Sequence, residues 1–383
     1  MRSPLLSLCR FSPGTPYGRG RGEPWRYFDC RTTIAAKNPA QREEILANPG
    51  FGVHFTDHMV SITWTKGQGW HSATVKPYGP LTLDPAGAVL HYGQETFEGM
   101  KAYRHADGSL ALFRPLENIR RLNNSDRRLC IPQLDEEQVL EAIKTIVRVD
   151  ADWVPKSYET SLYIRPFVFA TEVGVGVHPS NTYKFVIILS PVGAYYPEGV
   201  NPVKIYVEDE FTRASVGGTG FTKAAANYAI SLAAQEKAMK LGYTQVLWLD
   251  SVEKKYVEEV GTMNVAFVID GKVVTPSLDT GSILPGITRK SMIELVRSWG
   301  IPVEERKIAI TELMEAAENG KLEEAFGTGT AAVISPIGEL FYEGKTVTIS
   351  GFKTGKLTQK IYDELTAIQW GRKADPFGWV VKI

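Results

Sequence analysis

The chain has 383 residues, of which 43% are hydrophobic and 22% charged, a composition typical of a soluble globular protein with about two domains. Its 43 basic and 43 acidic side chains leave no formal net charge, which argues against electrostatic binding to nucleic acid. No apolar run reaches the ~20 residues that a membrane helix needs.

The cysteines and histidines do not suggest a metal site. The three cysteines, Cys9, Cys30 and Cys130, are too few and too scattered for a disulfide framework or a zinc site, and they favour a reducing compartment. His54 and His58 are four residues apart, but no glutamate follows His54 and no third ligand is near. We therefore expect no bound metal.

Residues 1–40 are predicted to be an N-terminal extension. They hold seven basic side chains and only two acidic ones, a balance typical of organelle transit peptides. Pro13, Pro16 and several glycines would interrupt the amphipathic helix of such a peptide. We therefore expect a disordered tail, with a transit peptide or a start codon placed too early as alternatives.

Residues 41–192 are predicted to form a small first domain. Apolar residues with strand-like alternation, or in short apolar runs, predict strands at 60–64, 110–113, 161–166 and 184–190. Helices are predicted at 114–130 and 135–149, the second from its amphipathic period. Alternation along the third of these strands places Tyr163 and Arg165 on one side.

The turn-forming residues at 193–203 predict an interdomain linker, and residues 204–383 are predicted to form a larger second domain. Strands are expected at 203–207, 244–249, 266–269 and 272–275, the last two joined by the Asp270-Gly271 turn. Helices are expected at 224–241, where Gly242 follows as a C-cap, and in a segment that ends at Trp299.

A glycine run leads directly into a single lysine at Gly217–Lys223 (GGTGFTK). Glycine allows the backbone to approach a ligand closely, and a lysine of lowered pKa attacks carbonyl compounds. A phosphate-binding P-loop is excluded, because Phe221 and Thr222 separate the glycine from the lysine and Ala224 follows it. A surface lysine and a Schiff-base lysine for pyridoxal phosphate remain.

Further blocks decide between these two. Asn227-Tyr228 follows the lysine, and the segments Phe97–Ala102 (FEGMKA) and Tyr256–Asn264 (YVEEVGTMN) complete a set that resembles the branched-chain aminotransferases. These are fold-type-IV pyridoxal-phosphate enzymes, and the resemblance runs from about Phe51 to the C-terminus. It implies an α/β (α+β) protein with a small N-terminal α/β domain, a larger C-terminal pseudo-barrel domain, and a homodimer.

The resemblance also implies a reaction and a cofactor. Lys223 would form a Schiff base with pyridoxal 5′-phosphate and transfer the amino group of L-leucine, L-isoleucine or L-valine to 2-oxoglutarate. Glu259 would keep the pyridine nitrogen protonated and Tyr228 would hydrogen-bond the phenolic oxygen, whereas Glu258 would point to the other face of its strand. The implied phosphate contacts are Arg121, Thr262, Ile287, Thr288 and Thr330.

The implied substrate contacts lie in several segments: Phe51, Tyr92, Phe97, Tyr163, Arg165, Tyr195, Ala331 and Ala332. Aromatic walls suit an aliphatic side chain, and Arg165 would hold the second carboxylate of glutamate or 2-oxoglutarate. The chain has Ala332 and Ser335 where the animal enzymes carry a Cys-x-x-Cys pair, so thiol regulation of that kind is not expected.

Three alternatives follow from the same residues. A D-amino-acid aminotransferase and an aminodeoxychorismate lyase share the fold, the lysine and the glutamate. A non-enzymatic relative would have lost Lys223 or Glu259, and both are present. The three blocks together favour the branched-chain type. We expect a cytoplasmic enzyme, or a mitochondrial or plastid one if residues 1–40 are a transit peptide.

Overall fold

The computed structural model describes residues 29–30, 37–193 and 200–383. Most of the predicted N-terminal extension lies outside this range. The chain divides into two compact units, Met1–Ala194 with Asp375–Ile383, and Tyr195–Ala374. No helix among the described residues is long and apolar enough to cross a membrane.

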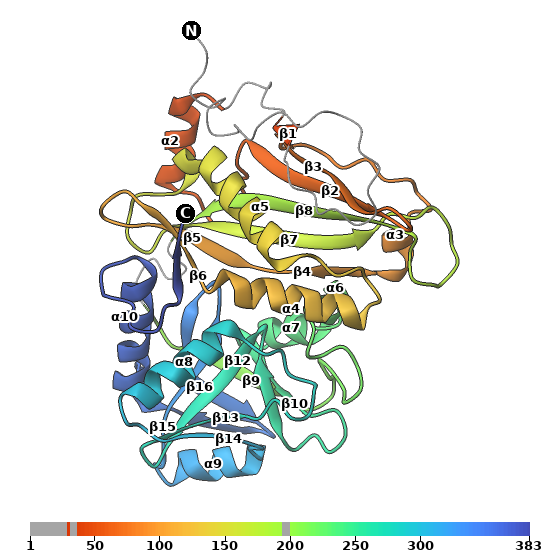
Figure 1. The fold of residues 1–383 in the computed structure, drawn as a ribbon. Helices are drawn as coiled ribbons and strands as arrows, with labels where there is room; N and C mark the ends of the chain where they lie inside the picture. Colours follow the sequence, from red (N-terminus) through yellow and green to blue (C-terminus); the bar gives the residue numbers. More distant parts are fainter. Residues whose placement is uncertain (1–28, 31–36, 194–199) are drawn as a thin grey trace. The chain divides into compact units, whose positions relative to one another are not determined.

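The first unit is built on one sheet. Its strands are β1 (Asp29–Cys30), β2 (His58–Thr65), β3 (Gly69–Pro77), β4 (Glu95–Phe97), β5 (Met100–Arg104), β6 (Leu110–Phe113), β7 (Ser161–Ala170), β8 (Thr182–Val192) and β18 (Val380–Lys382). They follow the order β1-β3-β2-β8-β7-β5-β6-β18, with β4 paired to β7 (Figure 1). The four strands predicted for this unit are confirmed.

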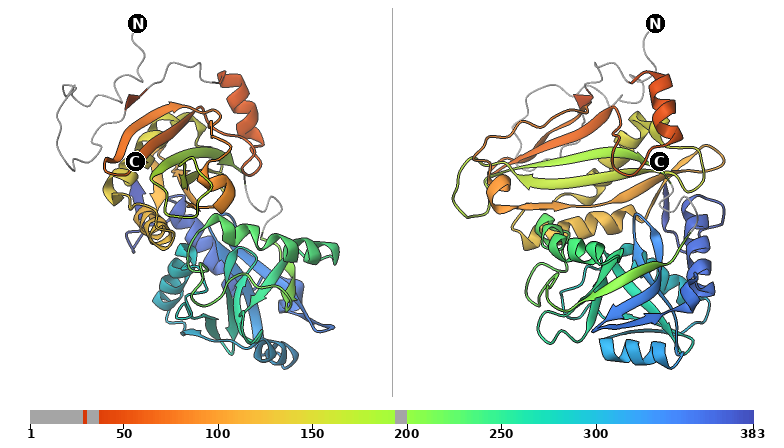
Figure 2. Two further views of the ribbon diagram at one scale, coloured as in Figure 1. Left: turned by 90° about the vertical axis from the view of Figure 1, so that its right-hand side faces the viewer. Right: turned by 180° about the vertical axis from the view of Figure 1, so that it is seen from behind.

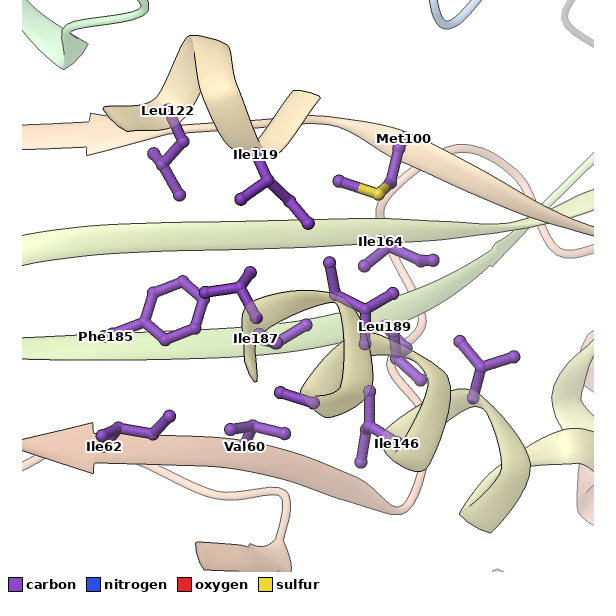
Figure 3. Packing of buried hydrophobic residues seen from close by; sticks show 14 of the residues in the cluster. Val60, Ile62, Met100, Ile119, Leu122, Ile146, Ile164, Phe185, Ile187 and Leu189 are labelled. Carbon is purple, nitrogen blue, oxygen red and sulfur yellow. The ribbon is translucent and has the colours of Figure 1, made fainter. Parts of the chain in front are cut away.

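Helices cover this sheet and close its core. They are α2 (Pro39–Ala47), α3 (Ala88–Tyr92), α4 (Pro115–Arg128), α5 (Glu136–Val149) and the short η1 (Ala151–Trp153). The predicted helix at 135–149 is confirmed, and it begins where the Asp135 side chain accepts a hydrogen bond from the Gln138 amide at 2.9 Å, a normal N-cap. Figure 3 shows Ile119 of α4 and Ile146 of α5 packed with side chains of the strands.

The second unit contains a closed sheet. Its strands are β9 (Val203–Glu208), β10 (Gln245–Leu249), β11 (Val257–Val260), β12 (Met263–Ile269), β13 (Lys272–Pro276), β14 (Val303–Arg306), β15 (Leu322–Gly329), β16 (Val333–Tyr342) and β17 (Lys345–Thr348). They follow the order β11-β10-β9-β16-β15-β12-β13-β14, and β11 also pairs with β12. That pairing joins β11, β10, β9, β16, β15 and β12 into a ring, which is the expected pseudo-barrel.

The helices of this unit are α6 (Ala225–Ala229), α7 (Leu232–Lys240), α8 (Ile287–Ser298), α9 (Ile310–Glu318), α10 (Lys356–Gln369) and the short η2 (Ser350–Phe352). The prediction of one continuous helix at 224–241 is wrong, because the chain breaks between α6 and α7. The Ser231 hydroxyl donates to the Tyr228 carbonyl at 2.7 Å, a local bond of the kind that competes with helix continuation.

The C-terminal segment returns to the first unit. Strand β18 pairs antiparallel with β6, with Val381 opposite Leu112, and the dark blue chain end can be followed there in Figure 2. The predicted second domain, 204–383, therefore differs from the second unit at its carboxyl end, because residues 375–383 belong to the first unit.

Candidate active site

The loop before Lys223 is fixed by the side chain of Asn227. Its amide donates to the carbonyls of Thr219 at 2.8 Å and Thr222 at 2.9 Å, and its oxygen accepts from the Thr219 hydroxyl at 2.6 Å. A Cβ at Gly220 would stand 2.1 Å from the carbonyl oxygen of Ser282, so only glycine fits there. The glycine run therefore holds the lysine in one position against the chain before α8.

The amine of Lys223 contacts a tyrosine from the following helix. Nζ donates to the Tyr228 hydroxyl at 2.8 Å and lies 4.9 Å from the centre of its ring. Tyr228 is in α6, so the five-residue spacing noted in the sequence brings the two groups together. The hydroxyl orients the amine, which is what a reacting lysine requires.

Glu259 of β11 is a buried acid near Lys223. Its Oε1 accepts from the Leu284 amide at 2.7 Å, and its Oε2 lies 3.4 Å from Nε of Arg213. Burial raises the pKa of Glu259, while the charge of Arg213, the Leu284 amide and the charge of Lys223 oppose that rise. The carboxylate is thus held by a cation and an amide, within electrostatic reach of the amine of Lys223.

Arg213 was not identified from the sequence. It is buried, and its guanidinium also donates to the carbonyls of Gly220, at 3.3 Å, and Ser282. It therefore ties the glycine run, the carboxylate of Glu259 and the segment before α8 to one another. A single arginine ten residues before the lysine carries no recognisable spacing, so only the folded chain shows this role.

The segment that leads into α8 supplies further donors. Asn264 holds it, because its Nδ2 donates to the Leu284 carbonyl at 2.8 Å and its Oδ1 would lie 1.9 Å from a Cβ at Gly286. Helix α8 begins at Ile287 after the N-cap residue Gly286, and no side chain of the described residues caps it. The amides of Ile287 and Thr288 therefore lie where a helix start can bind an anion. These are the two amides predicted to bind phosphate.

Threonines complete this part of the unit. Thr328 of β15 is 3% exposed, and its hydroxyl has no hydrogen-bond partner within the described parts of the chain. It stands opposite Asn264 in the sheet, and α8 packs against β15. The two threonines predicted as phosphate contacts lie elsewhere: Thr330 is in the turn after β15, and Thr262 is exposed in the turn before β12.

Ala331 and Ala332 occupy the same turn as Thr330, between β15 and β16. The turn is tight, because the Ile334 amide donates to the Ala332 carbonyl at 2.8 Å and Val333 has a φ of 62°. A left-handed valine is strained, so the turn holds its amides in a fixed, unusual orientation. The predicted contact with a substrate carboxylate stays a prediction.

These residues fit pyridoxal phosphate. The unit offers an oriented amine at Lys223, a buried carboxylate at Glu259 for a protonated ring nitrogen, and free amides at the start of α8 for a phosphate. The buried hydroxyl of Thr328 has an unused hydrogen-bonding capacity, which a phosphate oxygen would satisfy. Each chemical group of the cofactor therefore has a complementary group in the chain.

In the first unit, three predicted aromatic substrate residues gather with a fourth predicted residue, Arg165. The guanidinium carbon of Arg165 lies 4.7 Å from the ring centre of Phe97 and 5.3 Å from that of Tyr163, whose hydroxyl accepts from Arg165 at 3.0 Å. Phe51 packs edge-on against Tyr163 at 5.5 Å. The strand alternation correctly placed Tyr163 and Arg165 side by side, and we call these four residues the aromatic–arginine cluster.

Two further contacts define how the side chains of this cluster are held. The Tyr163 hydroxyl lies so close to Gly99 that a Cβ there would stand 1.9 Å away, so Gly99 is required for the tyrosine to lie as it does. The Nε of Arg165 is buried and has no hydrogen-bond partner among the described residues. Glu95 is partly buried, which raises the pKa of its carboxyl, and the charge of Arg165 opposes that rise.

Three other predicted residues have different surroundings. Tyr92, at the end of α3, is 41% exposed and its hydroxyl donates to the Val175 carbonyl. Arg121 is buried in a two-pronged ion pair with Glu98, Nε to Oε1 at 2.7 Å and a terminal nitrogen to Oε2 at 2.9 Å. Tyr195 lies outside the described residues. A phosphate contact of Arg121 therefore stays a prediction.

The comparisons with known proteins agree with this chemistry. Residues 95–340 match the family model described as Amino-transferase class IV. Branched-chain-amino-acid transaminase 1 of Bacillus subtilis is 57% identical over 335 residues, which is 87% of this chain and 94% of the relative. The branched-chain-amino-acid aminotransferase of Mycolicibacterium smegmatis is 50% identical over 360 residues, covering 92% and 98%.

Solved structures give the same result. The branched-chain amino acid aminotransferase of Escherichia coli superposes with a TM-score of 0.69 at 27% identity, covering 84% of this chain and 98% of that one. A further branched-chain amino acid aminotransferase, solved with pyridoxamine 5′-phosphate, gives the same TM-score, identity and coverage.

Proposed function

Because the chain belongs to the class IV aminotransferase family, we propose that it transfers the amino group of L-leucine, L-isoleucine and L-valine to 2-oxoglutarate, forming branched-chain 2-oxo acids and L-glutamate. The relatives at 56–57% identity are named for this reaction. The observation that carries the proposal is the amine of Lys223, bonded to Tyr228 and within electrostatic reach of the buried Glu259.

The cofactor is pyridoxal 5′-phosphate, as in the rest of the family. When bound, it supplies a conjugated ring that accepts the electron pair released at the substrate's Cα. We assign its contacts to Lys223, Tyr228 and Glu259, and its phosphate to the amides of Ile287 and Thr288. Arg121, Thr262, Thr330 and the buried Thr328 are further candidates for the phosphate.

Each residue then has a defined task. Lys223 Nζ moves the proton of the substrate's Cα, since an amine of suitable pKa serves as both acid and base. Tyr228 orients that amine, as the 2.8 Å bond indicates. Glu259 would hold a proton at the ring nitrogen, and the charge of Arg213 favours the ionised form of Glu259 against the effect of burial.

The aromatic–arginine cluster fits the two kinds of substrate. Its rings can bury an aliphatic side chain, which needs no hydrogen-bond partner there. The guanidinium of Arg165 stands among these rings, and a planar guanidinium is the group that a second carboxylate of glutamate or 2-oxoglutarate would pair with. We therefore assign substrate side-chain binding to the residues of this cluster, with Tyr92, Tyr195, Ala331 and Ala332 as further contacts.

The test is a coupled assay of glutamate formation from L-leucine and 2-oxoglutarate. We expect activity in the wild type and none in Lys223→Ala, whereas Lys240→Ala, a change at an exposed lysine of α7, should remain active. A D-amino-acid aminotransferase would consume the D-enantiomer of a racemic substrate, and an aminodeoxychorismate lyase would not turn over leucine. Either result would reject the branched-chain assignment while keeping the family.

We further propose a homodimer located in the cytoplasm. The homodimer is what the resemblance to the branched-chain aminotransferases implies, and the cytoplasmic location is supported by the bacterial relatives, which match over almost their full length. Light scattering of the purified holoenzyme tests the homodimer, and the mass of a single chain would contradict it. Fractionation of cells that express the full chain tests the location, with recovery in an organelle or a membrane fraction as the contrary result.

A further inference from the structure

Strand β11 carries two buried acids at neighbouring positions. Glu258 is 4% exposed and Glu259 is 3% exposed. Successive side chains of a strand point to opposite faces, so Glu258 faces away from the groups assigned to the cofactor. A buried carboxylate loses its hydration and is repelled by a second one nearby. The contacts of Glu258 show how the chain accommodates both acids.

A short segment before α8 holds both carboxylates. The Ser282 hydroxyl donates to Oε1 of Glu258, and the Leu284 amide donates to Oε1 of Glu259 at 2.7 Å. Ser282 and Leu284 are only two positions apart, so the two bonds depend on the same stretch of backbone. A change at one carboxylate therefore reaches the other through this segment.

The same segment holds Arg213. The guanidinium donates to the carbonyl of Ser282, and its Nε lies 3.4 Å from Oε2 of Glu259. Ser282 thus bonds Glu258 through its hydroxyl and Arg213 through its carbonyl. One buried cation is therefore linked to both acids, directly to Glu259 and through Ser282 to Glu258.

The groups around Glu258 decide how readily it ionises. Burial raises the pKa of Glu258, and the hydrogen bond from Ser282 opposes that rise. The charge of Arg213 also opposes it, the charge of Asp250 adds to it, and the charge of Lys254 opposes it. The other charged residues beside it are Glu253 and Lys307. The two largest opposing influences come from Ser282 and Arg213, which are bonded to each other.

Glu259 responds to the charge of its neighbour. Burial raises the pKa of Glu259, and the charge of Arg213 and the Leu284 amide oppose that rise. The charge of Glu258 adds to the rise, and the charge of Lys223 opposes it. Like charges in a buried site disfavour the ionisation of each other. Glu259 therefore ionises less readily beside a charged Glu258 than beside a neutral residue.

We propose that Glu258 is a positioning residue of the cofactor site, which limits the negative charge of Glu259 by drawing on the same arginine and the same backbone segment. The inference rests on the proposed function for the role of Glu259 at the ring nitrogen. Its effect on the reaction is the pH at which Glu259 ionises, which lies higher with a charged Glu258 than with Arg213 serving Glu259 alone.

The direct test follows the carboxyl of Glu259 by carbon-13 NMR. The full-length chain is made with glutamate labelled at the side-chain carboxyl and is freed of cofactor, and the signal that Glu259→Gln removes is followed against pH. We expect this signal to titrate at lower pH in Glu258→Gln than in the wild type, because glutamine still accepts the Ser282 bond but carries no charge. Glu258→Asp restores the charge and should move the midpoint back. Glu253→Gln removes an exposed carboxylate of the turn after β10, whose charge water screens, and should leave the midpoint unchanged.

A second variant keeps the test decisive if Glu258→Gln does not fold. Ser282→Ala removes the hydroxyl that donates to Glu258 but keeps the carbonyl that accepts from Arg213. Glu258 then binds a proton more readily, because the lost bond favoured its ionised form. The signal of Glu259 should therefore move in the same direction, to lower pH. In the holoenzyme, the acidic limb of kcat should also move to lower pH in Glu258→Gln.

A Glu259 midpoint that stays at the wild-type pH in both variants would overturn the proposal. A midpoint that moves to higher pH would show that Glu258 supports the ionisation of Glu259 instead of limiting it. An equal shift in Glu258→Asp would assign the effect to packing and not to charge. Because the NMR titration needs neither cofactor nor turnover, it decides this inference even where the leucine assay fails, and that failure would count against the proposed function alone.

Discussion

Replacing Arg213 with glutamine should impair the reaction without touching the substrate. Nε of Arg213 and Oε2 of Glu259 are 3.4 Å apart, and both side chains are buried. Two unit charges at that distance attract by about 5 kcal/mol at an effective dielectric constant of ~20. The variant loses this attraction, although the amide of Leu284 still supports the carboxylate.

The direction in which the pKa of Glu259 shifts in this variant follows from its burial. Burial already raises the pKa of Glu259, and Arg213 is the largest opposing influence. Without that cation the pKa rises further, so Glu259 becomes neutral in a range where the wild type is ionised. Replacing a supporting group of this kind typically lowers activity by ~10–100-fold. We expect kcat of the variant to fall by that amount at neutral pH.

The assay is the pH dependence of kcat together with the cofactor absorbance. The proposed role of Glu259 requires its ionised carboxylate, so the acidic limb of the profile should move to higher pH in Arg213→Gln, and raising the pH should recover part of the activity. Arg213→Lys restores the charge and should move the limb back. Arg289→Gln, at another buried arginine of the unit that bonds Pro276 and Glu305, is the matched control. An acidic limb at the wild-type position in Arg213→Gln would refute the reasoning.

Three further outcomes are expected. Gly99→Ala places a Cβ 1.9 Å from the Tyr163 hydroxyl, so it should raise KM for leucine at least several-fold while cofactor absorbance stays normal; an unchanged KM would contradict this. Tyr228→Phe removes the 2.8 Å partner of the Lys223 amine, and under the proposed function it should lower kcat about 10-fold or more, with cofactor content measured as the control. Burial lowers the pKa of His58, but the hydrogen bond and charge of Asp150 together with the charge of Asp57 outweigh it and raise the pKa above 6.5. This stabilisation is present below pH 6.5 and is lost as pH rises through the raised value, so urea unfolding of His58→Gln should lack that pH dependence.

Local patterns predicted the parts of the structure that depend on nearby residues. The amphipathic period of α5, the alternation that pairs Tyr163 with Arg165, and the Asp270-Gly271 turn, with φ of 48° and 73°, are each encoded within a few residues. The spacing of Lys223 and Tyr228, which are five positions apart, is also a local feature of the sequence. Their roles came from the resemblance, and the 2.8 Å bond between them agrees with it.

The rest depends on contacts between distant segments. Arg213 and Glu259 are 46 positions apart in the sequence and form an ion pair in the structure. No local pattern around either residue predicts that ion pair. The break between α6 and α7 depends on a serine that a propensity scale accepts in a helix. Thr328 was missed because a buried hydroxyl without a partner becomes visible only when the strands around it are assembled. The pairing of β11 with β12 that closes the barrel is a topological fact of the same kind.

The return of β18 to β6 has a consequence for synthesis. The first unit is interrupted by the whole second unit, since residues 375–383 rejoin the sheet that residues 29–193 begin. During translation one edge of β6 stays unpaired until roughly 270 later residues have been made. An unpaired strand edge can pair with other chains. The second unit is continuous and can fold before that strand arrives. Truncation just before Val380 should therefore make the whole chain prone to aggregate through the open edge of the first unit, while the second unit stays folded.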